Sequence, residues 1–221
     1  MAPIIKGGKK MADKKNVWDK LANKYNRLWV QKYSLTPTRN RVKQILSDHF
    51  HADEFTLLDL GCGTGQLLSE LRENNPNCRL IGVDKSSEMI RQANRQKNNI
   101  EFSCLDADND DLLERFPAGS FNTVICCHSF PYYKNKATVL NTLYKLLNSG
   151  GIAVFVQASV NSVYDKIALR VVEATAEKAE YLSRKAFRLL VAEHFEITEE
   201  FTVREKFYMP SICGFVMRKR P

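Results

Sequence analysis

The chain has 221 residues, 44% of them hydrophobic, and a formal net charge of +8 at pH 7. This length suffices for one buried core, and no apolar run approaches the ~20 residues that cross a bilayer. The charge lies at the ends: residues 1–15 carry five lysines and one aspartate (+4), and the last four residues carry three cations (+3). The body between them is close to neutral, which disfavours a nucleic-acid partner.

Six cysteines lie mostly in apolar, strand-like runs, and no Cys-x-x-Cys pair occurs. Cys126 and Cys127 are adjacent, so in a strand their side chains face opposite sides and cannot hold one metal ion together. We therefore expect reduced thiols, no metal site and a cytoplasmic protein.

The N-terminal region is predicted to be helical after a basic leader. Residues 1–15 are lysine-rich without the apolar stretch of a secretory signal, and we expect them to be disordered. Residues 16–33 place their apolar side chains with helical periodicity. Pro37 interrupts this pattern and begins a second predicted helix over residues 37–50.

From Phe55 onward, short apolar runs alternate with amphipathic segments. Strands are predicted at residues 55–60, 78–84, 99–106, 121–128 and 151–158, and helices at 65–74, 86–97, 110–116 and 136–149. A long helical region at 161–193 follows, and then two β-like runs at 195–208 and 212–219 that look like an antiparallel pair. Strand–helix alternation of this kind predicts a doubly wound α/β sheet.

The run LLDLGCGTGQLLSEL follows the first predicted strand and places glycines at positions 61, 63 and 65. Glycine lets the backbone bend tightly and approach a ligand, and the helix that follows directs free N–H groups at the turn. The fingerprint of a nicotinamide dinucleotide site needs its third glycine at position 66, where the chain has Gln66.

Acidic residues accompany three consecutive strands: Asp59 lies within the first, Asp84 ends the second and Asp106 ends the third. A rim this acidic repels a pyrophosphate and attracts a positively charged ligand. A carboxylate at Asp84 can bind both ribose hydroxyls, and one at Asp106 can accept from an adenine amine. S-adenosylmethionine carries adenine, ribose, an ammonium and a sulfonium, and it meets these demands.

Five segments together, "LLDLGCGTG", "GVDKSSEMI", "CLDAD", "FNTVICCHSF" and "LLNSGGIAVF", resemble the class I S-adenosylmethionine-dependent methyltransferases. The likeness runs from about Val17 to Gly214, and it is to the small-molecule branch typified by the ubiquinone and menaquinone C-methyltransferases. It implies a Rossmann-like, seven-stranded mixed sheet with an antiparallel last strand and an N-terminal helical extension. Residues 16–50 would form a helical lid on a catalytic core at residues 51–221.

The resemblance also implies how the cofactor, S-adenosylmethionine, is bound. Its methionine moiety is expected at Asp59 and at the glycine turn, which comprises Gly61, Cys62, Gly63 and Gly65. Cys127 or His128, just past the fourth strand, would border the transferring methyl. The plainer alternative for Asp59 is that it caps the following helix.

The adenosine moiety is expected at the ends of the second and third strands. Asp84 would hold the ribose, with Lys85 and Met89 near the adenine, and Asp106 would bind the adenine amine beside the Ala107 backbone. The alternatives are that Asp84 is only a helix N-cap and that Asp106 belongs to a solvated acidic run.

The acceptor is poorly encoded, because methyl transfer mainly needs alignment and exclusion of water. His128 is a candidate general base, or it shapes the pocket. Tyr132 and Tyr133 would stack on an acceptor or pack the loop. One helical stripe, formed by Tyr25, Trp29 and Tyr33, would contact the acceptor from the lid or pack as core. We expect a small, partly apolar or aromatic acceptor.

Three other functions stay open. Nucleic-acid amino-methyltransferases carry a [DNS]-P-P-[YFW] element, from which "SFPY" departs at Phe130. A protein acceptor is a second alternative, and a catalytically silent S-adenosylmethionine-binding subunit is a third. The sequence leaves monomer and homodimer both open.

Overall fold

The computed structural model describes residues 17–28, 31–50, 54–96, 98–109, 111–173, 178–203 and 209–221. The basic leader expected at 1–15 and the side chain of Trp29 lie outside this part of the chain. Within it, no helix is long and apolar enough to cross a membrane.

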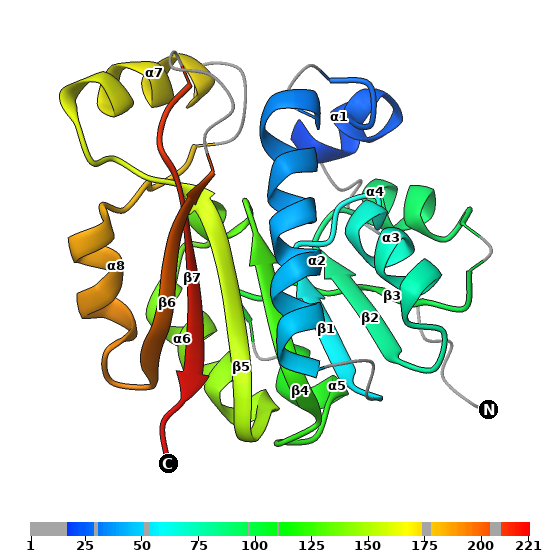
Figure 1. Cartoon of the computed structure of the whole chain (residues 1–221). Coiled ribbons are helices and arrows are strands. Elements are labelled where there is room, and N and C mark those ends of the chain that lie inside the picture. The colour runs from blue at the N-terminus through cyan, green and yellow to red at the C-terminus, as the bar shows by residue number, and fades with distance from the viewer. Residues whose placement is uncertain are drawn as a thin grey trace, which may run out of the picture.

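Seven strands form one sheet in the order β3-β2-β1-β4-β5-β7-β6 (Figure 1). Their bounds are β1 Thr56–Leu60, β2 Arg79–Asp84, β3 Glu101–Cys104, β4 Phe121–Cys127, β5 Leu147–Ala158, β6 Phe195–Val203 and β7 Ile212–Lys219. The first five strands are parallel, and β7 pairs antiparallel with both β5 and β6. The predicted sheet with its antiparallel last strand is confirmed.

Helices cover both faces of the sheet. On one face lie α2 (Thr36–Phe50) and α3 (Gln66–Asn74), and on the other lie α5 (Asp111–Arg115), α6 (Lys136–Leu146) and α8 (Arg184–Val191). Leu57 of β1 packs in the first layer, while Leu58 and Leu60 pack in the second. A strand buried on both faces needs a continuous apolar run, which makes the polar Asp59 in the middle of β1 conspicuous.

α4 (Ser87–Ala93) follows β2 and packs against β2 and β3. Two further helices, α1 (Val17–Tyr25) and α7 (Val163–Glu173), lie at the carboxyl end of the parallel strands (Figure 1). The Ser86 hydroxyl caps α4 by accepting from the Met89 N–H at 3.2 Å. The helix start expected at Ser86 is therefore present.

Two helix predictions are wrong in extent. The helix predicted over residues 16–33 ends at Tyr25, where the Gln31 side chain donates to the Tyr25 carbonyl at 3.1 Å, and a short π-helix at Gln31–Leu35 leads into α2. The expected stripe of aromatic residues on one helix therefore does not form. The region predicted at 161–193 is α7 and α8, separated by a segment in which the Glu180 N–H donates to the Pro131 carbonyl at 2.8 Å.

The antiparallel pair at the edge of the sheet depends on one glycine. Gly214 of β7 lies opposite Phe201 of β6, and a Cβ at position 214 would lie 2.1–2.6 Å from the phenyl ring. We predict that Gly214→Ala destabilises the fold by about 1–3 kcal/mol through overpacking. Thermal melting should show a decrease of about 2–4 °C per kcal/mol.

The control is a double-mutant cycle with Phe201→Leu, which replaces the ring with a smaller side chain and so removes the ring atoms that the new Cβ would meet. The two changes should be less destabilising together than the sum of their separate effects. A melting temperature for Gly214→Ala equal to that of the wild type would contradict the prediction.

Candidate functional site

The turn between β1 and α3 is held in a left-handed backbone that suits glycine. Gly61 and Gly65 have φ values of 76° and 75°. A Cβ at Gly61 would also lie 2.3 Å from the Ser129 Cβ, and one at Gly65 would lie 2.6 Å from the Phe102 ring. At both positions the conformation and the neighbouring side chain exclude other residues.

Asp84 ties this turn to the start of α4. Its carboxylate accepts the Gly63 N–H at 2.9 Å and the Ser86 N–H at 2.8 Å. A carboxylate fixed by two amides has lone pairs left for a ligand's hydroxyl groups. Asp84 therefore lies at the end of β2 with lone pairs left to accept further hydrogen bonds, and its role toward a ribose stays a prediction.

Asp59 is 3% exposed, on the side of the sheet that α2 and α3 cover. Burial, and secondarily the charge of Asp84, raises the pKa of Asp59 to about 7. Burial also raises the pKa of Asp84, although its two amide hydrogen bonds oppose the shift. A bound cation would offset this cost of keeping two carboxylates ionised out of water.

A first cavity opens above the carboxyl ends of β1, β2 and β4. The predicted cofactor residues that line it are Gly61, Gly63, Asp84, Lys85, Met89, Ala107 and Cys127. The predicted acceptor residues that line it are Tyr25, His128, Tyr132 and Tyr133. Segments from the N-terminal extension and from four strand ends therefore meet at one crevice, as parallel topology requires.

A second cavity adjoins the first under α2. The two share Tyr25, Gly61, Gly63, Cys127 and His128. The second cavity also contains Asp59 and Cys62 from the sequence prediction, together with Thr38 and Arg39 of α2. One end of the combined crevice is thus lined by an acid and a cation, and the other by apolar groups and Asp84.

Three predicted site residues do not line either cavity. The Asp106 carboxylate accepts the Asp108 N–H at 3.0 Å and closes a turn, while its neighbours Leu105 and Ala107 line the first cavity. Gly65 packs against Phe102, and Tyr33 packs against the core on the α2 side of the sheet. Trp29 lies outside the described residues.

His128 lies where β4 ends, in a left-handed conformation with a φ of 60°. Such a backbone costs a non-glycine residue about 1–3 kcal/mol and is common at functional sites. Its ring Nε2 lies 3.0 Å from the Thr38 hydroxyl. Burial, together with the nearby charge of Arg39, lowers its pKa to about 4, which makes His128 a weak base at neutral pH.

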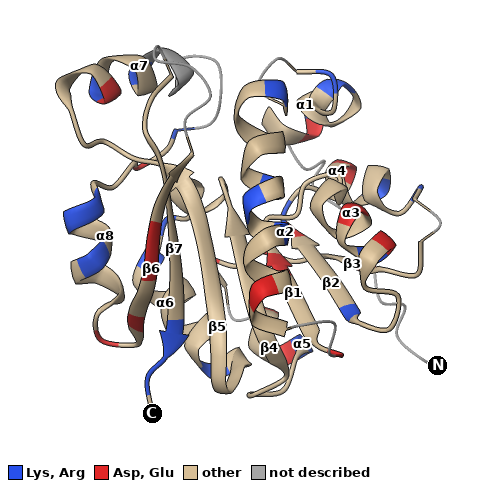
Figure 2. Ribbon diagram, in the orientation of Figure 1, with Lys and Arg blue, Asp and Glu red and all other residues tan. Residues whose placement is uncertain are grey.

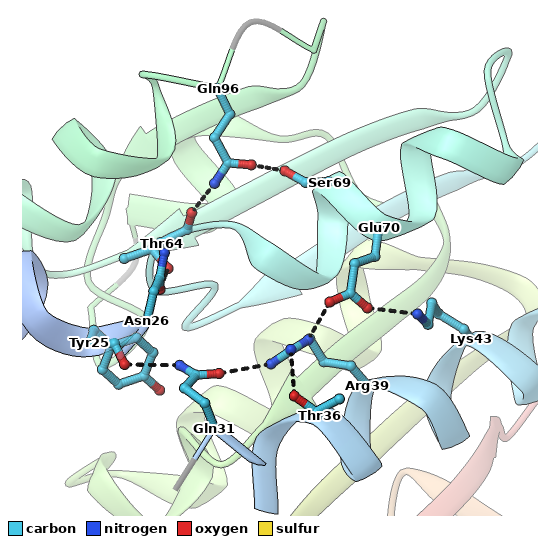
Figure 3. A network of polar contacts seen from close by, with 10 residues as sticks. All are labelled: Tyr25, Asn26, Gln31, Thr36, Arg39, Lys43, Thr64, Ser69, Glu70 and Gln96. Carbon is cyan, nitrogen blue, oxygen red and sulfur yellow. Dashed lines mark hydrogen bonds and ion pairs between the residues drawn. The ribbon is translucent and has the colours of Figure 1, made fainter. Parts of the chain in front are cut away.

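A polar network fastens the N-terminal extension over the glycine turn (Figure 3). Arg39 donates to the Gln31 amide at 3.0 Å and to Glu70 of α3 at 2.8 Å. On the other side of Tyr25, the Thr64 hydroxyl donates to Asn26 at 2.6 Å. Tyr25 is thereby held 3.7 Å from where a Gly63 Cβ would lie.

Trp18, Thr38 and Arg39 are among the cavity residues that the sequence did not predict. Trp18 was assigned only to a periodic helix, yet its ring packs edge-on against Tyr132 with centroids 5.0 Å apart. Thr38 and Arg39 fall on a polar stretch of α2. A polar face on a predicted helix is normally solvated, so nothing in the sequence distinguishes these two residues from their neighbours.

We predict that Asp59→Asn changes the pH dependence of stability in the ligand-free protein. The ordinary pKa of 3.8 rises to about 7 on folding, so the stability contributed by protonated Asp59 is lost as the pH rises from about 4 through 7. Thermal melts at pH 5 and pH 8 should show that the stability of the variant relative to the wild type is greater at pH 8. The difference between the two pH values should approach about 3 kcal/mol, because about two pKa units lie between pH 5 and the folded-state pKa, at about 1.4 kcal/mol per unit.

Asp48→Asn, the same change at an exposed position of α2, is the matched control and should leave the profile unaltered. If the stabilities of the wild type and Asp59→Asn depend on pH in the same way, the surroundings of Asp59 do not raise its pKa.

Known proteins resemble this chain in sequence. A family profile described as a methyltransferase domain matches residues 58–153. A malonyl-[acyl-carrier protein] O-methyltransferase of Acetivibrio thermocellus is 32% identical over 101 residues, which cover 45% of this chain and 34% of the relative. A demethylmenaquinone methyltransferase of Thermotoga maritima is 26% identical over 153 residues, covering 68% of this chain and 64% of the relative. The chain thus spans less than two thirds of the length of each of these two relatives.

The structure has neighbours as well. The crystal structure of an S-adenosylmethionine-dependent methyltransferase of Thermotoga maritima superposes with a TM-score of 0.72 at 18% identity, covering 92% of this chain and 99% of the neighbour. At this identity the likeness concerns the fold alone. Residues 58–153 therefore match a methyltransferase domain, and the fold is that of a solved S-adenosylmethionine-dependent methyltransferase, in agreement with the resemblance that the motifs indicate.

Proposed function

We propose that the protein transfers a methyl group from S-adenosylmethionine to a small, partly apolar or aromatic acceptor. The observation that carries this proposal is the pair of joined cavities. One offers Asp59 and Arg39 to an amino acid, the other offers Asp84 to a nucleoside, and they meet at Gly61, Gly63 and Cys127.

The first cavity suits adenosine. Asp84 would accept both ribose hydroxyls while keeping its bonds to the Gly63 and Ser86 amides. Met89, Leu105 and Ala107 provide apolar contacts for the flat base. Asp106 was expected to bind the adenine amine; since Asp106 does not line the cavity and Ala107 does, the Ala107 backbone is the better candidate.

The second cavity suits the methionine moiety. The Asp59 carboxylate would hold the ammonium, and the Arg39 guanidinium would hold the carboxylate, so that the two charges of a zwitterion each have a partner. Arg39 is oriented by hydrogen bonds to Gln31, Thr36 and Glu70, of 3.0, 2.9 and 2.8 Å. Such preorganisation lowers the entropic cost of binding.

When bound, S-adenosylmethionine supplies a methyl group already activated by a sulfonium. The protein has to exclude water and align the acceptor with the methyl–sulfur axis. Tyr25 covers the glycine turn, and the Thr38 hydroxyl orients the His128 ring. With a pKa of about 4, His128 orients the acceptor as a neutral group more readily than it removes a proton.

The acceptor would enter beside Trp18, Tyr132 and Tyr133, which line the first cavity. Flat aromatic walls favour an apolar or aromatic acceptor. The named activities of the relatives concern different acceptors, a malonyl carrier protein and demethylmenaquinone. The match to them therefore supports methyl transfer without selecting an acceptor.

We predict that S-adenosylmethionine raises the melting temperature. At a hundredfold excess over its dissociation constant it should stabilise the fold by about 2.7 kcal/mol, or roughly 5–11 °C for a domain of this size. Asp84→Ala should lose most of this shift. A full shift in that variant would refute the ribose assignment, and stabilisation by NADH instead of S-adenosylmethionine would refute the cofactor.

The two halves of the crevice can be tested separately with 5′-methylthioadenosine, which lacks the amino-acid moiety. Asp84→Ala should weaken both ligands, whereas Arg39→Met should weaken S-adenosylmethionine alone by tenfold or more. Arg218→Met, at an exposed position on β7, is the matched control. Binding without transfer of labelled methyl to any metabolite fraction would identify a silent subunit.

We predict that His128 does not produce an inflection in the pH–rate profile near its ordinary pKa of 6.5. Burial holds its pKa near 4, and a bound sulfonium lowers it further. The logarithm of kcat/KM against pH between 5 and 8 should have the same shape for the wild type and His128→Gln. An inflection near pH 6.5 that disappears in the variant would establish a general base.

A further inference from the structure

Helix α7 exposes a face that combines aliphatic and cationic side chains. Val163 and Ile167 are 77% and 60% exposed, and Lys166 and Arg170 are exposed beside them. The four residues stand at positions i, i+3, i+4 and i+7, which places them on one side of a helix. We call Val163, Lys166, Ile167 and Arg170 the α7 face.

The orientation of the α7 face is fixed by the opposite side of the helix. Asp165 and Leu169 are buried, at 1% and 3% exposure. The Asp165 carboxylate accepts the Asn161 N–H at 3.1 Å and the Ser211 N–H at 2.8 Å, which ties α7 to the loop before β7. Helix α7 is therefore fixed against the rest of the protein, and Val163 and Ile167 are exposed in that fixed position.

The α7 face lies at the same end of the molecule as the crevice. α1 and α7 both stand at the carboxyl end of the strands (Figure 2), and α1 contributes Trp18 and Tyr25 to the first cavity. Lys20 and Lys24 of α1, four residues apart, are exposed, as is Arg27 just after the helix. The body of the chain is nearly neutral, yet this end carries at least five exposed cations.

We propose that this end of the protein docks on an anionic lipid surface through the α7 face, with the cations of α1 assisting. Aliphatic side chains flanked by lysine and arginine on one side of a helix suit the boundary between headgroups and acyl chains. Val163 and Ile167 enter the apolar layer, while the cations stay at the level of the lipid phosphates. A protein partner would need pockets for these anchors, which a bilayer does not.

Docking in this orientation brings the crevice mouth to the lipid surface. An acceptor dissolved in the bilayer then reaches the first cavity without crossing water, a consequence that rests on the proposed methyl transfer. The docking itself does not require catalysis, so vesicle binding tests it separately.

The test is co-sedimentation of the full chain with vesicles of phosphatidylcholine alone and with 30% phosphatidylglycerol. The wild type should bind the anionic vesicles at least tenfold more strongly than the neutral ones, and less at high salt. Lys166→Glu/Arg170→Glu and, separately, Ile167→Asp should each weaken binding at least tenfold. Melting curves should stay unchanged, because these side chains are exposed.

The controls change similar residues elsewhere. Lys145→Glu/Arg218→Glu makes the same charge change at exposed positions at the opposite end of the sheet, and Leu189→Asp alters a side chain of α8 that is 71% exposed. Both should bind like the wild type. If the test and control variants lose vesicle binding equally, net charge alone explains the binding and the α7 face is not the docking site. If the wild type stays in the supernatant with anionic vesicles, the proposal is overturned in favour of an acidic protein partner.

Discussion

Two carboxylates near the carboxyl ends of β1 and β2 determine how the site is built: Asp59 is buried and Asp84 is partly buried. Asp59 interrupts an otherwise apolar strand, and Asp84 lies close enough to raise its pKa. A fold tolerates such a pair when a function needs it, since each charge is costly without a partner. Asp84 accepts one hydrogen bond from an amide of the glycine turn and a second from the amide of Ser86, the N-cap of α4. The Arg39 guanidinium of α2 lines the second cavity together with Asp59.

The N-terminal extension completes what the sheet leaves open. It supplies Trp18 and Tyr25 to the first cavity, and Thr38 and Arg39 to the second. Apolar packing of Val42, Ile45 and Leu46 fixes α2 against the sheet. Polar contacts then tie the extension to α3 and α4, such as Arg39 with Glu70 and Asp19 with the Ser86 hydroxyl at 2.6 Å. Polar contacts of this kind break at less cost than apolar packing, which suits a segment that covers a ligand site.

The fold could be predicted from the sequence because its signals are local. Strand–helix alternation, the glycine turn and the Ser86 cap each act within a few residues, and the parallel topology then brings the strand ends together. The N-terminal extension shows where this method fails. Periodicity predicted one helix through Tyr33, but the Gln31 side chain takes the carbonyl of Tyr25 and the helix ends there. Thr38 and Arg39 were missed because their importance comes from α2 packing over β1, a contact between residues far apart in the sequence.

Gly61 and Ser129 hold the loop after β1 against the loop after β4. The absent Cβ of Gly61 leaves the room that the Ser129 side chain fills, and the Ser129 hydroxyl donates to the Leu60 carbonyl at 2.7 Å. The loop after β4 is therefore fixed against the loop after β1, and both line the first cavity. Under the proposed function, a substitution at Ser129 that changes the choice of acceptor would also change the affinity for the methyl donor, so the two properties would be coupled at this point of the chain.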